Sequence, residues 1–164
     1  MLKDMLYLYT EVLFMDKKIS QELMSFIKKS PTAFHAIDNI KKTLLENGFE
    51  ELLEGQVWKI ETGKRYFVSR NNSSIIALNL GTDLSNYSFN VAASHSDSPT
   101  FKIKENAEIE IRGKYTQLNT EGYGGMLCST WFDRPLSIAG RVLVRDGGRY
   151  LTRLINCDGD LVLI

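Results

Sequence analysis

The chain has 164 residues, of which 43% are hydrophobic and 24% are charged, a composition typical of a soluble globular protein of about one domain. Its 20 basic and 20 acidic side chains give a net charge of zero, and no run of lysine and arginine is longer than two. This balance argues against a broad electrostatic surface for nucleic acid or for an acidic membrane.

The first 14 residues, Met1 to Phe14, are apolar but fit no targeting segment. They have no basic start and no small-residue cleavage site, and Glu11 interrupts the apolar stretch, so they do not resemble a signal peptide. They are too short to span a bilayer, which needs about 20 apolar residues. Because Met15-Asp16-Lys17-Lys18 resembles a natural translation start, we expect an upstream extension, or a helical turn that packs on a neighbour.

Two helices are predicted next. The first has an apolar stripe at helical spacing and ends at Ser30-Pro31; the stripe consists of Ile19, Leu23, Phe26 and Ile27. Thr32 can cap the second helix, which would end before Gly48. Its inner side would carry Phe34, Ile37, Ile40, Leu44 and Leu45. His35 lies on this helix, and we interpret it as a surface or packing histidine.

Strand signals follow. Residues 65–70 and 74–80 are rich in β-formers and flank Asn71-Asn72-Ser73, which predicts a hairpin. The apolar run Phe89 to Ala93 predicts a strand that is buried on both faces. Alternating charged and apolar residues at 102–104 and 108–112 predict half-exposed strands.

The segment Ser94-His95-Ser96-Asp97-Ser98-Pro99 directly follows the predicted buried strand. The imidazole of His95 can bind a transition metal, and in an extended backbone Asp97, two residues on, points to the same side. Asp97 could then accept the N–H of the ring nitrogen that faces away from the metal, which orients the ring and makes it a better ligand. Alone, this spacing is common by chance, and a histidine after a strand is more often a hydrogen-bonded structural residue.

The last third of the chain reads as a loop, a packing block and further strands. Residues 118–125 are rich in glycine and predict a loop, which lacks the lysine and serine of a phosphate-binding loop. For Trp131-Phe132-Asp133-Arg134 we favour packing over direct chemistry, with Asp133 and Arg134 paired to backbone or to each other. Residues 140–145 and 149–155 predict strands joined by a turn at 146–148. The two cysteines, Cys128 and Cys157, are too few for a disulfide framework and predict reduced thiols in a cytoplasmic protein.

Three ordered blocks resemble the aspartyl aminopeptidase and aminopeptidase I family of zinc metallopeptidases. The first lies between Phe26 and Arg70, and the second is Ala93-Ser94-His95-Ser96-Asp97-Ser98-Pro99. The third comprises Glu121-Gly122-Tyr123-Gly124-Gly125, Thr130-Trp131-Phe132-Asp133-Arg134-Pro135-Leu136-Ser137 and Ala139-Gly140-Arg141-Val142. The similarity runs from about Ile19 to the last residue.

The resemblance implies a metalloaminopeptidase, a hydrolase that releases N-terminal amino acids from peptides. In this family two zinc ions share a site, a glutamate acts as general base, and the complete protein is a homo-oligomer. His95 would bind one zinc ion, and Asp97 would be the catalytic residue that orients it. The family's other ligands come from later parts of the chain and have no counterpart in residues 1–164. We therefore expect an N-terminal fragment, from a truncated chain or a fragmentary gene product, that is inactive alone.

The resemblance also implies an α/β fold, with N-terminal helices followed by a mixed β-sheet. We assign residues 1–14 to an extension of unclear status, 15–140 to the N-terminal part of a zinc-peptidase-like catalytic domain, and 141–164 to the start of an inserted β-rich domain. Two alternatives stay open: a non-catalytic interaction module or degenerate paralogue, and another zinc hydrolase with the same H-x-D motif. A reading frame that continues past Ile164 with carboxylates and a late histidine would favour the aminopeptidase.

Overall fold

The computed structural model describes residues 17–83 and 85–159, so the segment Met1 to Phe14 lies outside the described residues. The chain divides into two compact units. The first contains the residues up to Ser96 together with Ala139–Asn156, and the second contains Asp97–Ile138 and the residues from Cys157. Each unit is described by itself. The predicted domain boundary after residue 140 falls inside a strand of the first unit and stays a prediction.

The first unit opens with the two predicted helices. Residues 17–29 are helical, and the second helix is α2, Ala33–Glu46. Thr32 caps α2 as predicted, since its hydroxyl oxygen accepts the backbone N–H of His35. At the other end Gly48 has φ +77°, and the N–H groups of Gly48 and Phe49 donate to the carbonyls of Leu45 and Leu44. This pairing satisfies the last carbonyls of the helix, and it needs the left-handed backbone that glycine adopts without strain.

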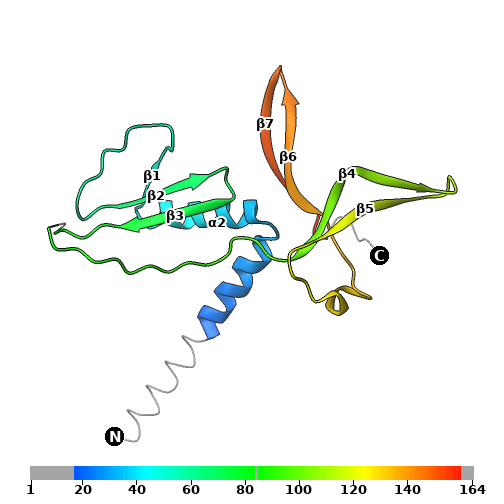
Figure 1. Ribbon diagram of the computed structural model, residues 1–164, viewed down its shortest axis with the longest axis horizontal. Coiled ribbons are helices and arrows are strands. Elements are labelled where there is room, and N and C mark those ends of the chain that lie inside the picture. The colour runs from blue at the N-terminus through cyan, green and yellow to red at the C-terminus, as the bar shows by residue number, and fades with distance from the viewer. Residues whose placement is uncertain (1–16, 84, 160–164) are drawn as a thin grey trace, which may run out of the picture. The chain divides into compact units, whose positions relative to one another are not determined.

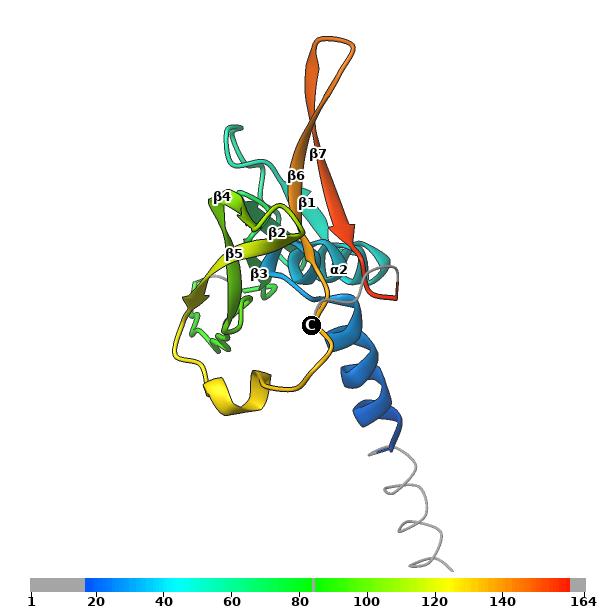
Figure 2. The same cartoon turned by 90° about the vertical axis from the view of Figure 1, so that its right-hand side faces the viewer.

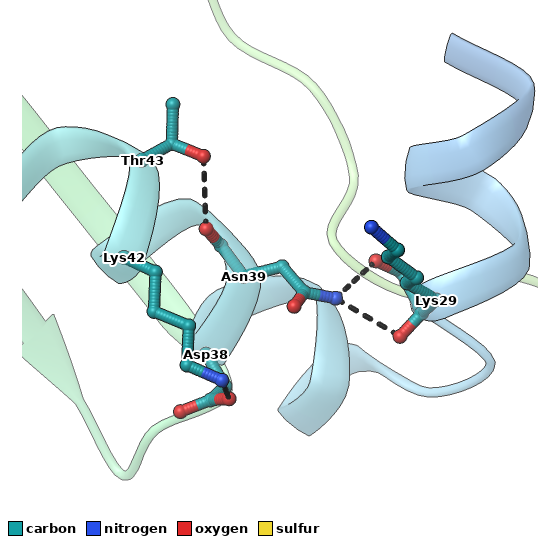
Figure 3. A network of polar contacts seen from close by, with 6 residues as sticks. Lys29, Asp38, Asn39, Lys42 and Thr43 are labelled. Carbon is teal, nitrogen blue, oxygen red and sulfur yellow. Dashed lines mark hydrogen bonds and ion pairs between the residues drawn. The ribbon is translucent and has the colours of Figure 1, made fainter. Parts of the chain in front are cut away.

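The two helices are joined by polar contacts at their junction (Figure 3). The amide of Asn39 on α2 donates to the carbonyl of Lys29 at 2.9 Å and to the hydroxyl of Ser30 at 3.1 Å. Thr43 donates one turn later to the carbonyl of Asn39 at 3.1 Å. Asn39 therefore satisfies the Lys29 carbonyl, one of the acceptors that helical hydrogen bonding leaves unpaired at the end of the first helix.

A three-stranded mixed sheet completes the core of this unit. Its strands are β1 (Glu50–Leu52), β2 (Arg65–Arg70) and β3 (Ser74–Asn79), in that order, with β1 parallel and β3 antiparallel to β2. Helix α2 contacts β1 and β3 (Figures 1 and 2). The buried hydrophobic residues of the described chain come from α2 and β2; they are Ala36, Ile37, Tyr66 and Phe67. The predicted hairpin is confirmed, and with it the α/β class with helices before a mixed sheet.

The predicted strand at Phe89–Ala93 is wrong. Residues 87–95 have no regular structure, and the side chains of Phe89 and Val91 are 80% and 82% exposed. A strand needs a neighbour that accepts and donates its backbone hydrogen bonds. The sheet ends at β3, and no described strand pairs with this segment. The apolar run therefore lies extended on the surface.

The hairpin β6 (Ala139–Asp146) and β7 (Arg149–Asn156) belongs to the same unit and is confirmed. Gly147 and Gly148 form its two-residue turn, with φ of +52° and +81°. A two-residue turn with positive φ at both positions has a twist that matches the right-handed twist of the paired strands, and such turns are common in hairpins. The resulting twisted ribbon is clear in Figure 2.

The second unit is built on one long hairpin, β4 (Thr100–Ile111) and β5 (Tyr115–Tyr123). The register shifts between Ile103 and Glu108, so the ladder has two sections, 100–103 and 108–111, which overlap the strands predicted at 102–104 and 108–112. Residues 102–104 are all exposed, so the predicted alternation of buried and exposed positions is absent there. The loop predicted over residues 118–125 is wrong for its first six residues, which belong to β5. Glycine content favoured a loop, but pairing with β4 overrides that local preference.

Candidate functional site

His95, the predicted metal ligand, is an exposed residue at the end of the extended surface segment. The next residue, Ser96, is anchored within the first unit, because its hydroxyl donates to the carbonyl of Ser73 at 2.7 Å. Ser73 lies in the turn between β2 and β3. The backbone beside His95 is thus tied to the central hairpin, while the imidazole lies where a metal ion or a further protein segment can reach it.

Asp97, the predicted orienting carboxylate, begins the second unit. Its Oδ2 accepts a hydrogen bond from the hydroxyl of Tyr123 at 2.6 Å. This hydrogen bond and the charge of Asp97 raise the pKa of the Tyr123 phenol, because both favour its protonated form. The hydrogen bond from His95 to Asp97 stays a prediction.

The contact of Tyr123 with Asp97 is one that the sequence did not predict. Tyr123 belongs to the glycine-rich segment of the third resembling block, but it lies 26 residues from Asp97 in sequence. Only the pairing of β4 with β5 brings the two together, with Thr100 opposite Tyr123. Because we interpreted residues 118–125 as a loop, no pairing partner was available from which to place Tyr123. A strand prediction at 115–123 is the signal that would have found it.

The block Trp131-Phe132-Asp133-Arg134 packs only in part: Trp131 makes a ring contact, whereas Phe132 is 68% exposed. Trp131 ends the short 3-10 helix η1 (Cys128–Trp131), and its ring meets Phe101 edge to face at a centroid distance of 5.3 Å. Asp133 has φ +53°, in the left-handed region that aspartate tolerates better than most residues. The predicted pairing of Asp133 with Arg134 or backbone stays a prediction.

His35 is a packing histidine on α2, as predicted. Its Nδ1 lies 2.8 Å from the hydroxyl of Thr32, beside the helix cap. Partial burial lowers the pKa of His35, and the nearby charge of Asp38 opposes this shift. A neutral imidazole that accepts from Thr32 fits these surroundings. Cys128 and Cys157 are both free thiols.

The described residues do not complete a metal site by themselves. Among them, no three His, Cys, Asp or Glu side chains are grouped so that they could hold a metal ion. A catalytic zinc ion is held by about three protein ligands. His95 can therefore supply one ligand, and any zinc bound there would need ligands beyond residues 17–83 and 85–159. No helix in these ranges is long and apolar enough to cross a membrane.

Comparison with known proteins places these residues in one family. The sequence model of the family described as aminopeptidase I zinc metalloprotease (M18) matches residues 26–164. A probable M18 family aminopeptidase 2 of Clostridium novyi is 46% identical over 151 residues, which cover 90% of this chain and 35% of that protein. The aspartyl aminopeptidase of Dictyostelium discoideum is 43% identical over 139 residues, or 84% of this chain and 28% of that protein. The chain thus spans about a third of the length of these relatives.

Solved structures agree with the sequence comparison. The structure of mApe1 from Chaetomium thermophilum superposes with a TM-score of 0.74 at 35% identity, over 85% of this chain and 32% of that one. The mApe1 dodecamer of S. cerevisiae gives a TM-score of 0.71 at 28% identity, over 84% and 33% of the two chains. The match of the family model over residues 26–164 includes the three resembling blocks and His95. The chain therefore belongs to the M18 family of aminopeptidases.

Proposed function

We propose that this chain is part of a zinc-dependent aminopeptidase that releases N-terminal amino acids from peptides, with His95 as one of its zinc ligands. The observation that carries the proposal is the family match over residues 26–164, which includes the segment around His95. The exposed imidazole, on a backbone tied down at Ser96, supports the assignment. Imidazole is a ligand that zinc prefers in proteins.

The chain's own contribution is limited to one ligand and its support. A catalytic zinc site needs about three protein ligands, and the described residues bring no such group together. We assign the remaining ligands, a second zinc ion and the general base to residues outside this chain. Residues 1–164 alone should therefore neither bind zinc tightly nor cleave peptides.

The setting of the proposed enzyme follows from the same family. A relative whose structure is described as a dodecamer supports a homo-oligomer, and the aminopeptidase family supports peptide substrates. Two free cysteines fit a reducing, cytoplasmic compartment. We further propose that the residues from about 141 onward open an inserted β-rich domain, which the β6–β7 hairpin would begin.

A pair of histidine variants tests the ligand assignment in the complete protein that contains this chain. His95→Ala should lose zinc, measured by metal analysis, and with it the release of N-terminal residues from peptides. His35→Ala is the matched control, because it removes the other histidine of the chain, which lies beside the Thr32 cap of α2, and it should keep both properties. Zinc and activity that persist in His95→Ala would remove His95 from the site. A wild-type protein without zinc or activity would favour a non-catalytic module instead.

The isolated chain gives a second test. Titration of metal-free residues 1–164 with zinc should show no stoichiometric binding in the micromolar range, and a peptidase assay should show no turnover. The physical reason is that one imidazole contributes one of about three ligands. Tight stoichiometric binding or clear peptide cleavage by these residues alone would contradict the proposal.

A further inference from the structure

The turn between β2 and β3, residues 71–73, holds the segment that carries His95. The hydroxyl of Ser96, the residue after His95, donates to the carbonyl of Ser73 at 2.7 Å, although 23 residues separate the two serines in sequence. All three residues belong to the first unit. Residues 87–95 have no regular structure, so the hydrogen bonds of a sheet do not fix their backbone. The bond from Ser96 is therefore a direct restraint on the position of His95.

This hydrogen bond is partly shielded from water. Both Ser96 and Ser73 are half-buried, whereas His95 itself is exposed. The distance of 2.7 Å is the usual one for a hydroxyl donating to an oxygen. Because water competes less well for a half-buried donor and acceptor, losing this bond should cost more than losing one on the open surface.

The turn that accepts this bond is itself restrained. Asn71 and Asn72 have φ of +52° and +51°, a left-handed backbone that asparagine tolerates better than most residues. The N–H of Ser73 closes the turn by donating to the carbonyl of Arg70 at 3.1 Å. From β6, the guanidinium of Arg141 donates to the carbonyl of Asn71 at 3.0 Å. The acceptor of the Ser96 hydroxyl is thus held from within the hairpin and from a second hairpin of the same unit.

We propose that Ser96 is a positioning residue for the zinc ligand His95, and that it acts by holding the neighbouring backbone on the β2–β3 turn. The inference rests on the proposed function and adds a residue whose role neither the sequence motif nor the comparisons assign. A metal ligand must be held within roughly 0.5 Å of its productive position. With the backbone fixed at Ser96, part of the conformational entropy that zinc binding would otherwise remove at His95 is already lost in the folded chain. Ser96 contacts neither metal nor substrate in this scheme.

The test is Ser96→Ala in the complete protein that contains this chain. Zinc affinity, measured by competition with a chelator, should fall roughly 2- to 10-fold, the range that one neutral hydrogen bond is worth. The value of kcat measured at zinc concentrations below saturation should fall with it, while KM for the peptide stays constant. Because zinc affinity is measured on the folded protein, a loss of overall stability alone would not change it.

Two further variants make the test specific. Ser96→Thr keeps the hydroxyl and should bind zinc as the wild type does. Ser94→Ala is the matched control, because it makes the same change at the other neighbour of His95, where the side chain is exposed, and it should leave zinc affinity unchanged.

The outcomes separate this inference from the proposed function. Unchanged zinc affinity in Ser96→Ala, an equal loss in Ser94→Ala, or a Ser96→Thr variant as weak as Ser96→Ala would overturn the positioning role and leave the proposed function intact. If the wild-type protein holds no zinc, or if His95→Ala keeps it, the proposed function fails first and the inference falls with it.

Discussion

Lys41 and Lys42 are neighbours on α2, but their ion pairs have very different surroundings. The ammonium of Lys41 lies 2.5 Å from Glu51 on β1, and these two side chains are only 22% and 28% exposed. The hydroxyl of Ser69 on β2 accepts a hydrogen bond from Lys41 and donates one to Glu51, each at 3.4 Å. The ammonium of Lys42 lies 2.7 Å from Asp38, one turn back on the same helix, with 64% and 47% exposure. Solvent screens the second pair far more than the first.

This contrast predicts unequal losses of stability. Lys41→Met should lower the free energy of unfolding by about 1–3 kcal/mol, because Glu51 would stay partly buried without its counter-charge. Lys42→Met, the control on the same helix, should cost at most about 0.5 kcal/mol. Urea unfolding of each variant measures both values. Equal losses would mean that the Lys41–Glu51 pair contributes no more than an exposed one.

At the scale of elements, the sequence correctly predicted the helices and turns whose ends are marked by capping residues or glycines. Thr32 and Gly48 mark the ends of α2, and Gly147-Gly148 marks a two-residue hairpin turn, and all of these lie where expected. Elements that depend on a distant partner were predicted less well. The run from Phe89 to Ala93 has strand composition without a strand to pair with, and β5 has loop composition with a partner in β4. Composition describes what a segment can form, and pairing decides what it does form.

Arg141 attaches the β6–β7 hairpin to the rest of the first unit. Its guanidinium lies 4.0 Å from the centre of the Phe34 ring on α2. The same group donates to the carbonyl of Asn71 at 3.0 Å and to the Asn71 side chain at 3.1 Å, in the β2–β3 turn. A planar guanidinium can stack on a ring and donate in its plane at the same time, which an ammonium cannot do. One residue thus connects three elements.

Replacing Arg141 by lysine should loosen this attachment, so that the β6–β7 hairpin detaches and its pairing opens more often. Loss of the stacking and of one hydrogen bond is worth about 1 kcal/mol, which corresponds to roughly fivefold faster amide hydrogen exchange in β6 and β7. Arg145→Lys is the control, because Arg145 lies on the same strand in an exposed position. Hydrogen exchange followed by mass spectrometry measures both variants. Unchanged exchange in Arg141→Lys would mean that other contacts hold the hairpin.

At the scale of the whole chain, little apolar surface is covered. Among the described residues the fully buried hydrophobic positions are confined to α2 and β2, while the predicted apolar stripe of the first helix is largely exposed at Ile19, Leu23 and Ile27. The same holds for the candidate site: one short motif predicts His95 and Asp97, but the contact of Tyr123 with Asp97 depends on the fold, and a zinc ion bound at His95 would need ligands beyond the described residues. A motif identifies residues that are close in sequence, whereas a site also requires residues that only tertiary structure brings together.

The exposed apolar segment around Phe89 and Val91 should make residues 1–164 associate with themselves when no other chain covers it. Burying a large apolar side chain is worth about 1.5–3 kcal/mol, and an extended backbone without pairing partners adds hydrogen bonds between copies. Sedimentation velocity should therefore show a sedimentation coefficient that increases with concentration. The double variant Phe89→Ser, Val91→Ser should shift this increase to concentrations roughly tenfold higher or more, because two such side chains are lost.

The control is Leu143→Ser with Tyr150→Ser, which removes two exposed apolar side chains from the β6–β7 hairpin. It should have a much smaller effect, since those strands are already paired. A wild-type chain that stays monomeric at every concentration, or a hairpin variant as effective as the first, would show that residues 87–93 are not what drives association.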